Sequence, residues 1–447
     1  MTDSESLAEL RAACAEAGVH TVEVAAPDTQ GHLRGKRVPV ERFFATTASS
    51  GVHIADAMFV FDMQNDLPDN PLINMDSGYL DCHLVPDVAS GRILTHRPGY
   101  ALVFADAYDH TGAPHPLAPR GILAAQIDRC RARDLTPVVA TELEFFLCTP
   151  DWEPVQNHIQ YSSLTDAVEL EATLADMRAG LSGAGLEVES SNAEYGPGQI
   201  EINIEYADAM RTADNTVLMK SIVKQVAVQH GLRATFMPKP WFEQSGSGMH
   251  VHTSLRSGDA NAFTDAADGP NPLMRNWLGG LLEHASALSL LATPTSNGPK
   301  RIRPFTFVPT HVHWGLDNRS VLCRCIVEDG SAANRVEFRS AGADANPYLM
   351  IAGLLAAGTD GVERGLEPPA MSEGDMYSNP GDCAPLPADL TTAVAAFEGS
   401  DLADRLGATF AECYLCIARH EIALAAEHSP DQDDVNDWER ARFAEHS

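Results

Sequence analysis

Residues 138–147 of this chain read VVATELEFFL, and this alternating run predicts a β-strand. Side chains in a strand point in turn to the two faces of a sheet. Glu142 and Glu144 therefore share one face, while Leu143 and Phe145 share the other. The segment predicts a strand with one apolar face and one face that carries two carboxylates.

Three more segments repeat this alternation: GQIEINI (198–204), GMHVHTSL (248–255) and RVEFR (335–339). For any single strand, the simpler interpretation is an edge whose polar residues face water. Four such strands, whose polar faces hold mostly Glu, His and Arg, indicate instead faces that converge on one cavity. The polar residues that share a face are Gln199, Glu201 and Asn203 in the first, His250, His252 and Ser254 in the second, and Arg335, Glu337 and Arg339 in the third.

The predicted cavity has a definite chemistry. Carboxylates that lie close together repel, and they are forced to protonate unless cations neutralise them. Glutamates with one imidazole suit a hard divalent ion, Mg²⁺ or Mn²⁺. The interleaved arginines suit phosphate and carboxylate groups, which a guanidinium binds with two parallel hydrogen bonds. Metal and arginine around a phosphoryl group are the usual arrangement for phosphoryl transfer.

Composition excludes several classes of protein. The net charge of −31, from 31 basic and 62 acidic residues, is opposite to that of a nucleic-acid binder. No run approaches the roughly 18 apolar residues of a membrane span. The N-terminal segment MTDSESLAEL lacks the features of a secretion signal, so we expect a cytoplasmic protein. Nine cysteines show no disulfide framework, and we interpret Cys413 and Cys416 as thiols of an amphipathic helix.

The length of 447 residues predicts at least two domains. Residues 1–111 mix short strand-like runs with loops. The segment GAPHPLAPRG (112–121) is typical of a linker, and Pro119 within it is suited to the first turn of a helix. Beyond it, strands alternate irregularly with predicted helices at 175–186, 215–231, 276–292 and 346–361. No Rossmann or P-loop glycine pattern is present. We predict a small β-rich N-terminal domain (1–111) and a larger α+β domain (112–447).

At these residues the chain resembles the glutamine synthetase family of the bacterial type I kind, and most of all its γ-glutamylpolyamine and γ-glutamyl-monoamine (for example ethanolamine) synthetases. The resemblance covers roughly residues 20–380. It implies a β-grasp N-terminal domain, a catalytic domain whose antiparallel sheet forms a funnel-shaped active site, and a homo-oligomer of two hexameric rings, a dodecamer. The segments that carry it are TELEFF, AEYGPGQIEINI, GSGMHVHTSL, NGPKRIRP, WGLDNRSVLCR and NRVEFRSAGADANPYLMIAGLLAAG.

The resemblance also implies roles for individual residues. One metal would lie near glutamate and the amine, and the other would bridge the phosphates of ATP. The implied ligands are Glu142, His250 and Glu337 for the metal that bridges the phosphates, the first trio, and Glu144, Glu194 and Glu201 for the metal near glutamate and the amine, the second trio. The other implied contacts are Arg301, Arg339 and Gly246 to glutamate, Arg319 and Arg324 to the transferring phosphoryl group, and Arg335, His252, Ser254 and also Arg324 to the nucleotide.

The chemistry that the family implies has two steps. The γ-carboxylate of glutamate attacks the γ-phosphate of ATP to give γ-glutamyl phosphate, and an amine then displaces phosphate. Mg²⁺ or Mn²⁺ is the expected cofactor, with ATP as co-substrate and glutamate and an amine as partners. Charge neutralisation by metal and arginine supports the first step.

The amine half of the site departs from the family. Ammonia-using members carry a flap glutamate after the KR motif, and KRIRPFTFVP has Phe307 in its place. Asp56 is only a weak match to the aspartate that partners that glutamate, and Ser245 replaces an asparagine. Tyr161 lies at the spacing of a family tyrosine near the nucleophile, and Tyr377 lies in the segment that the family adenylylates, with different flanks.

Phenylalanine cannot accept a proton, but it can pack against a methylene chain or face a cation through its ring. We therefore expect an acceptor larger than ammonia, a polyamine or a small monoamine or amino alcohol, with Phe307 and Tyr161 near it. Two alternatives stay open. One is a glutamine synthetase that uses ammonia, and the other is a non-catalytic, ring-forming relative.

Overall fold

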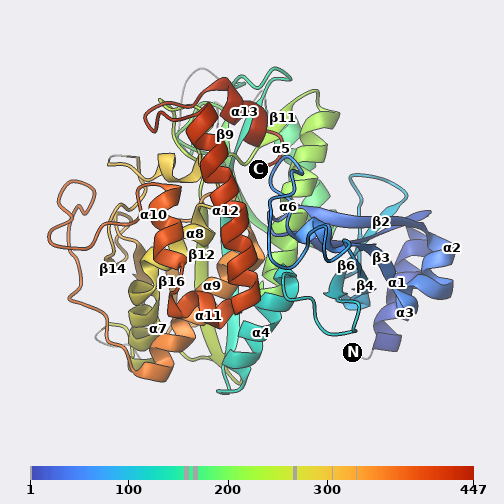
Figure 1. Cartoon of the computed structure of the whole chain (residues 1–447), viewed down its shortest axis with the longest axis horizontal. Helices are drawn as coiled ribbons and strands as arrows, with labels where there is room; N and C mark the ends of the chain where they lie inside the picture. The colour runs from blue at the N-terminus through green and yellow to red at the C-terminus, as the bar shows by residue number, and fades with distance from the viewer. Residues whose placement is uncertain (1–2, 156–160, 165–169, 265–268, 305, 329) are drawn as a thin grey trace.

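The computed structural model describes residues 3–155, 161–164, 170–264, 269–304, 306–328 and 330–447. The chain forms two β-sheets, one from the N-terminal hundred residues and a larger one with helices packed on it (Figure 1). This mixed α and β architecture confirms the predicted fold class. Among the described residues, no helix combines the length and apolar character needed to cross a membrane.

The N-terminal sheet has six strands in the order β2-β1-β6-β4-β3, with β5 paired to β6. β1 and β6 run parallel and the other pairs antiparallel, as expected for a β-grasp. Val22, Val24 and Val103 are fully buried in its core. The bounds are β1 (Thr21–Pro27), β2 (Leu33–Pro39), β3 (Val52–Ala55), β4 (Asp81–Pro86), β5 (Arg92–Ile93) and β6 (Tyr100–Tyr108), with helices α1 (Asp3–Glu16), α2 (Val40–Arg42) and α3 (Ala48–Ser50).

The larger sheet has ten strands, seven of them in the order β14-β15-β16-β12-β7-β9-β8. The four strands predicted from their polar faces, β16, β12, β7 and β9, are consecutive neighbours in it. The bounds are β7 (Thr136–Cys148), β8 (Val188–Ala193), β9 (Gln199–Ile204), β10 (Ala207–Asp208), β11 (Arg233–Thr235), β12 (Met249–Ser257), β13 (Ala260–Asn261), β14 (Trp314–Leu316), β15 (Cys323–Ile326) and β16 (Arg335–Phe338).

Strand register decides which polar side chains meet. Across antiparallel pairs, His250 lies opposite Glu142, His252 opposite Glu337 and Glu144 opposite Glu201. Residues opposite each other in a ladder are close neighbours on one face of the sheet. The alternation seen in the sequence therefore becomes one continuous acidic and imidazole-bearing surface.

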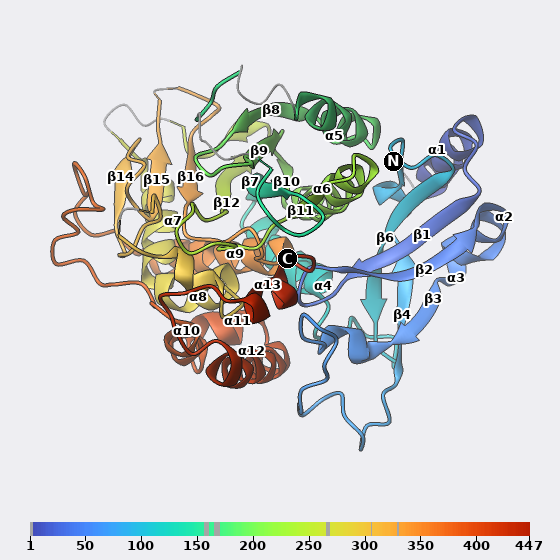
Figure 2. The same ribbon diagram turned by 90° about the horizontal axis from the view of Figure 1, so that it is seen from above.

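Helices bury the apolar side of this sheet (Figure 2). Pro119 begins α4 (Pro119–Arg131), as predicted, and the side chain of Asn346 caps α9 (Pro347–Arg364) by accepting from the backbone N–H of Tyr348. The other helices are α5 (Glu171–Gly183), α6 (Ala209–Gln229), α7 (Pro272–Glu283), α8 (Ala285–Ala292), α10 (Leu390–Phe397), α11 (Asp401–Leu406), α12 (Ala408–His428) and α13 (Asp437–Phe443).

The helix expected at 276–292 is in fact two helices, α7 and α8, that meet at His284. His284 is buried, and its Nε2 lies 2.8 Å from Oδ2 of Asp360 on α9. The hydrophobic pattern of the sequence continues through His284, so only its buried contact with Asp360 marks the boundary between α7 and α8. Cys413 and Cys416 lie on α12 as free thiols; Cys413 is buried as predicted, whereas Cys416 is only partly buried.

Candidate active site

The first predicted metal-binding trio comes together at the centre of the large sheet. Glu142 on β7, His250 on β12 and Glu337 on β16 each place a ligand atom within 4.8 Å of the others. His250 Nδ1 lies 3.2 Å from Oε2 of Glu142 and 3.5 Å from Oε1 of Glu337. Two carboxylates and one imidazole form a donor set that suits Mg²⁺ or Mn²⁺. The residues present therefore fit the metal that the family uses.

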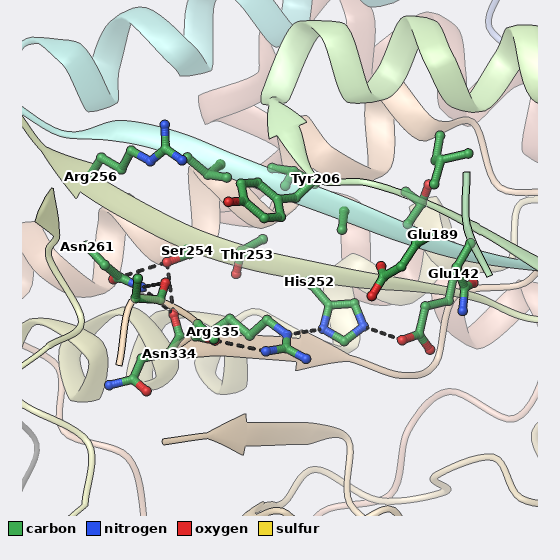
Figure 3. Close-up of a pocket in the computed structure, with 18 of the residues that line it drawn as sticks. Glu142, Glu189, Tyr206, His252, Thr253, Ser254, Arg256, Asn261, Asn334 and Arg335 are labelled. Carbon is green, nitrogen blue, oxygen red and sulfur yellow. Dashed lines mark hydrogen bonds and ion pairs between the residues drawn. The ribbon is translucent and has the colours of Figure 1, made fainter. Parts of the chain in front are cut away.

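A chain of hydrogen bonds orients Glu142 (Figure 3). Nε of Arg335 donates to Nδ1 of His252 at 3.1 Å, which leaves the ring proton on Nε2, 2.9 Å from Oε1 of Glu142. Burial opposes ionisation of Glu142, but His250 and His252 outweigh it and hold the pKa of this carboxyl below its usual value. Glu142 is therefore a fixed anion.

Two arginines hold Glu337, which is fully buried. Nη1 of Arg324 donates to its Oε2 at 2.9 Å, and Nη1 of Arg339 donates to its Oε1. Burial alone would raise the pKa of Glu337, but Arg339 and the two histidines lower it below the usual value. Arg324 and Arg339 thus line the same surface as the metal-binding trio, where phosphate charge would be neutralised.

The second predicted trio, Glu144, Glu194 and Glu201, is more widely spaced. Among the described residues, its ligand atoms do not all lie within the 4.8 Å that the first trio satisfies. Burial, followed by the charge of Glu144, raises the pKa of Glu194 to about 7 and the pKa of Glu201 to about 8. Glu144 itself accepts from the backbone N–H of Gly248 at 2.7 Å. This excess of negative charge is what a bound cation would relieve.

A cluster of buried arginine donors lies beside the trios. Arg301 is 2% exposed, and Arg339 is 5% exposed; in the described part of the chain, the Nε of each has no hydrogen-bond partner. Gly246 and Gly248 make room for Arg301. A Cβ added at Gly246 would lie 2.6 Å from Cγ of Arg301, and one at Gly248 would lie 2.4 Å from its Nη2. Buried donors of this kind call for an anionic partner such as a carboxylate.

A cavity of about 380 Å³ is lined in part by Glu142. Ser254, His252 and Arg335, three of the four predicted nucleotide contacts, line it (Figure 3), whereas the fourth, Arg324, is not among its lining residues. Oγ of Ser254 donates to the carbonyl of Asn334 at 2.9 Å. A cavity of this size, with a cationic side chain next to the first trio, fits a nucleotide whose phosphates reach toward Glu142 and Glu337.

An aromatic cluster borders the acidic side of the site. Phe307 has a left-handed φ of 62° and is 54% exposed. Its ring packs edge-on against Tyr195 at 5.3 Å and against Tyr377 at 6.4 Å between ring centroids. Tyr195 directly follows Glu194, so the cluster adjoins the second trio. Tyr195 is not among the site residues predicted from the sequence, although its position directly after the predicted ligand Glu194 could have indicated it.

Two predicted site residues lie toward solvent. Arg319 is exposed on the loop between β14 and β15, and its backbone carbonyl accepts from the hydroxyl of Tyr377 at 2.8 Å. Tyr161 is 59% exposed. In the described part of the chain, Phe307 makes its ring contacts with Tyr195 and Tyr377 rather than with Tyr161.

Known proteins share this sequence and architecture. Residues 116–442 match the family described as glutamine synthetase, catalytic domain. The chain is 33% identical over 442 residues to the glutamate–isopropylamine ligase of a Pseudomonas species, with 95% of each protein covered. It is 35% identical to the gamma-glutamylethanolamide synthetase of Streptomyces coelicolor, covering 98% of this chain and 95% of that one.

A solved structure of GmaS without ligand has a TM-score of 0.83 and 31% sequence identity, and the match covers 96% of this chain and 98% of that chain. The match in sequence and the match in structure both span nearly the whole length. The chain therefore belongs to the glutamine synthetase family and is an ATP-dependent carbon–nitrogen ligase.

Proposed function

We propose that this enzyme joins the γ-carboxylate of L-glutamate to an amine larger than ammonia, a small monoamine, amino alcohol or polyamine. The observation that carries the proposal is the aromatic cluster of Phe307, Tyr195 and Tyr377 beside the acidic trio. Ammonia-using members place a glutamate where Phe307 stands. An aromatic wall there can pack on methylene groups and face an ammonium through its rings.

The activating half of the reaction uses the first trio and its arginines. Arg301 and Arg339 would orient glutamate, and His252, Ser254 and Arg335 would hold the nucleotide. Arg324, and Arg319 from the adjoining loop, would stabilise the phosphoryl group as the γ-carboxylate of glutamate attacks it and ADP leaves. Magnesium or manganese, held by Glu142, His250 and Glu337 and by Glu144, Glu194 and Glu201, would neutralise phosphate charge. The product of this step is γ-glutamyl phosphate.

The second half needs a pocket for the amine. Glu144, Glu194 and Glu201 give that side of the site a negative potential, which attracts an ammonium ion. Phe307 is half-exposed, so part of its ring remains free to contact an alkyl group. The bound ammonium gives up a proton to a base, the free amine nitrogen attacks the acyl carbon, and phosphate leaves while the new amide nitrogen loses its second proton. The names of the two relatives, a glutamate–isopropylamine ligase and a gamma-glutamylethanolamide synthetase, agree with an alkyl-bearing acceptor.

An amine panel tests this proposal. Purified enzyme with glutamate, ATP and Mg²⁺ is assayed for phosphate release and for the amide product with ammonium, methylamine, isopropylamine, ethanolamine, putrescine and spermine. We expect product with at least one organic amine and a much lower kcat/KM with ammonium. Turnover with ammonium alone would identify a glutamine synthetase and overturn the proposal. No turnover with any amine would identify a non-catalytic relative.

We also propose the family's assembly and setting for this chain. The proposed division is an N-terminal domain of residues 1–111 and a catalytic domain of residues 112–447, with twelve chains in two hexameric rings. The nine cysteines are all free, which fits a reducing compartment, the cytoplasm. Light scattering of the purified protein checks the assembly, and a mass well below that of twelve chains would reject it.

A further inference from the structure

A second cavity, of about 560 Å³, lies away from the active site, between the N-terminal sheet and α6. Figure 2 shows the C-terminus beside the start of β2 at this place. The lining residues come from β2, from the turn before β6, from the loop after β7, from α6 and from β11. They include Arg37, Arg97, Trp152, Lys224, Val228 and Arg233. We call this space the basic cavity.

The charge of the basic cavity is opposite to that of the molecule. Of the described residues that line it, four are basic and Glu445 is the one acid, in a chain with a net charge of −31. Arg37 and Arg97 share a single carboxylate, Glu23, each at 2.7 Å from the same Oε1. Arg233 reaches Glu445 only at 4.0 Å. Two side-chain carboxylates thus face four cationic side chains.

Lys224 is one of these four cationic side chains. Its Nζ donates to the backbone carbonyl of Glu445, at 2.9 Å, and to the carboxylate of the C-terminal residue, Ser447. Burial, followed by the nearby charge of Lys220, lowers the pKa of Lys224 to about 7. The charge of this half-buried ammonium is therefore only partly offset by its surroundings. An anion in the cavity would supply the remaining negative charge.

Specific contacts hold the cavity open. Nε2 of Gln229 donates to the backbone carbonyl of His96 at 2.9 Å, and the ring of His96 hydrogen-bonds to Gln225 at 3.0 Å. These bonds fix the turn that carries Arg97 against α6. Trp152 and Val228 add apolar surface, and the guanidinium of Arg233 lies 5.9 Å from the ring of Trp152.

We propose that the basic cavity binds a small organic polyanion that carries at least two carboxylate or phosphate groups and an apolar portion. The guanidinium groups would pair with the oxyanions, and Trp152 and Val228 would cover the apolar portion. The ligand would connect the N-terminal sheet to α6. α6 in turn supports β7 through a 2.8 Å hydrogen bond between the buried hydroxyls of Thr216 and Thr141, next to Glu142. Binding should therefore raise the unfolding temperature of the whole chain.

Tryptophan fluorescence tests this proposal because Trp152 reports from within the cavity. The full-length enzyme, free of divalent metal, is titrated with citrate and, separately, with pyrophosphate. Sodium chloride at equal ionic strength is the reference. We expect a saturable change with at least one of the two polyanions and none with chloride, together with a higher unfolding temperature. Citrate alone would identify a carboxylate ligand, and pyrophosphate alone a phosphate ligand.

Variants assign the signal to the cavity. Trp152→Phe should abolish the fluorescence change, although four other tryptophans of the five remain. Arg233→Gln and Lys224→Gln should each weaken binding by roughly tenfold, since each removes one charge-assisted contact. Arg419→Gln is the matched control, because Arg419 lies on α12, is 48% exposed and pairs with Glu398. An equal response to chloride, a signal that survives Trp152→Phe, or unchanged affinity in both charge variants would overturn the proposal.

Discussion

The hydroxyl of Tyr377 lies 2.8 Å from the backbone carbonyl oxygen of Phe307. The same hydroxyl lies 2.8 Å from the backbone carbonyl of Arg319. One side chain therefore joins the loop that borders the amine side of the site to the loop that carries a proposed phosphoryl contact. Phe307 has a left-handed φ of 62°, which is unfavourable for a residue with a side chain. The single proton of the Tyr377 hydroxyl, shared between the two carbonyl oxygens, helps to hold Phe307 there.

Replacing this hydroxyl should uncouple the two half-reactions. In Tyr377→Phe, the Phe307 loop loses its restraint, and water gains access to γ-glutamyl phosphate. We expect a KM for the amine raised by about fivefold, the effect of one hydrogen bond. More phosphate should also be released than amide formed. Tyr108→Phe, in β6 of the other sheet, is the matched control. A ratio of phosphate to amide that stays at one would contradict this role.

Phe307→Glu should raise activity with ammonium. A glutamate there restores an anionic wall that binds a small cation, and it removes the apolar surface for an alkyl group. We expect kcat/KM for ammonium to rise by roughly tenfold and kcat/KM for the organic amine to fall by a similar factor. Phe307→Leu separates the two effects, because it should weaken use of the organic amine without any gain for ammonium. Equal changes for both amines in Phe307→Glu would argue against a specificity role.

Gly246→Ala should damage glutamate binding. The added Cβ would lie 2.6 Å from Cγ of Arg301 and 2.8 Å from the backbone oxygen of Pro238, so Arg301 must move. We expect the KM for glutamate to rise by at least about tenfold, because a misplaced guanidinium loses its paired hydrogen bonds. The KM for ATP should stay near the parent value. Gly121→Ala in α4, where the nearest heavy atom would lie 3.9 Å away, is the control.

In the metal-free protein, the contribution of Glu201 to stability should fall as pH rises. The pKa of Glu201 is raised from 4.5 to about 8, so the folded chain keeps a proton that the unfolded chain releases between these values. The unfolded state is therefore favoured progressively from about pH 5 upward, until pH exceeds about 8. Glu201→Gln remains neutral throughout. In EDTA it should be more stable than the parent at pH 8 by about 2 kcal/mol, with a smaller difference at pH 5.

Magnesium should change which of the two proteins, the parent or Glu201→Gln, is the more stable. The parent gains stability from the metal, whereas Glu201→Gln has lost a proposed ligand and gains less. Urea unfolding at pH 5 and pH 8, in EDTA and in Mg²⁺, measures all four conditions. If the two proteins show the same dependence on pH and on magnesium, Glu201 is not a member of the metal site.

Much of the fold and site could be predicted because the information is local. Alternation along a strand requires only neighbouring residues, so the shared faces of Glu142 with Glu144 and of His250 with His252 are visible in the sequence. The N-terminal end of α4 at Pro119 is local for the same reason. The break at His284 could not be predicted, since its partner Asp360 is 76 residues away.

The order of residues along each segment is enough to predict the alternating strands and the types of side chain on their polar faces. How those faces meet depends on the pairing of strands that lie far apart in the chain. Register across β7, β12 and β16 brings Glu142, His250 and Glu337 within 4.8 Å of one another, while the second trio stays wider. Long-range contacts also build the aromatic cluster around Phe307 and the basic cavity. Pairing over such separations depends on the packing of the whole chain, which no short segment encodes.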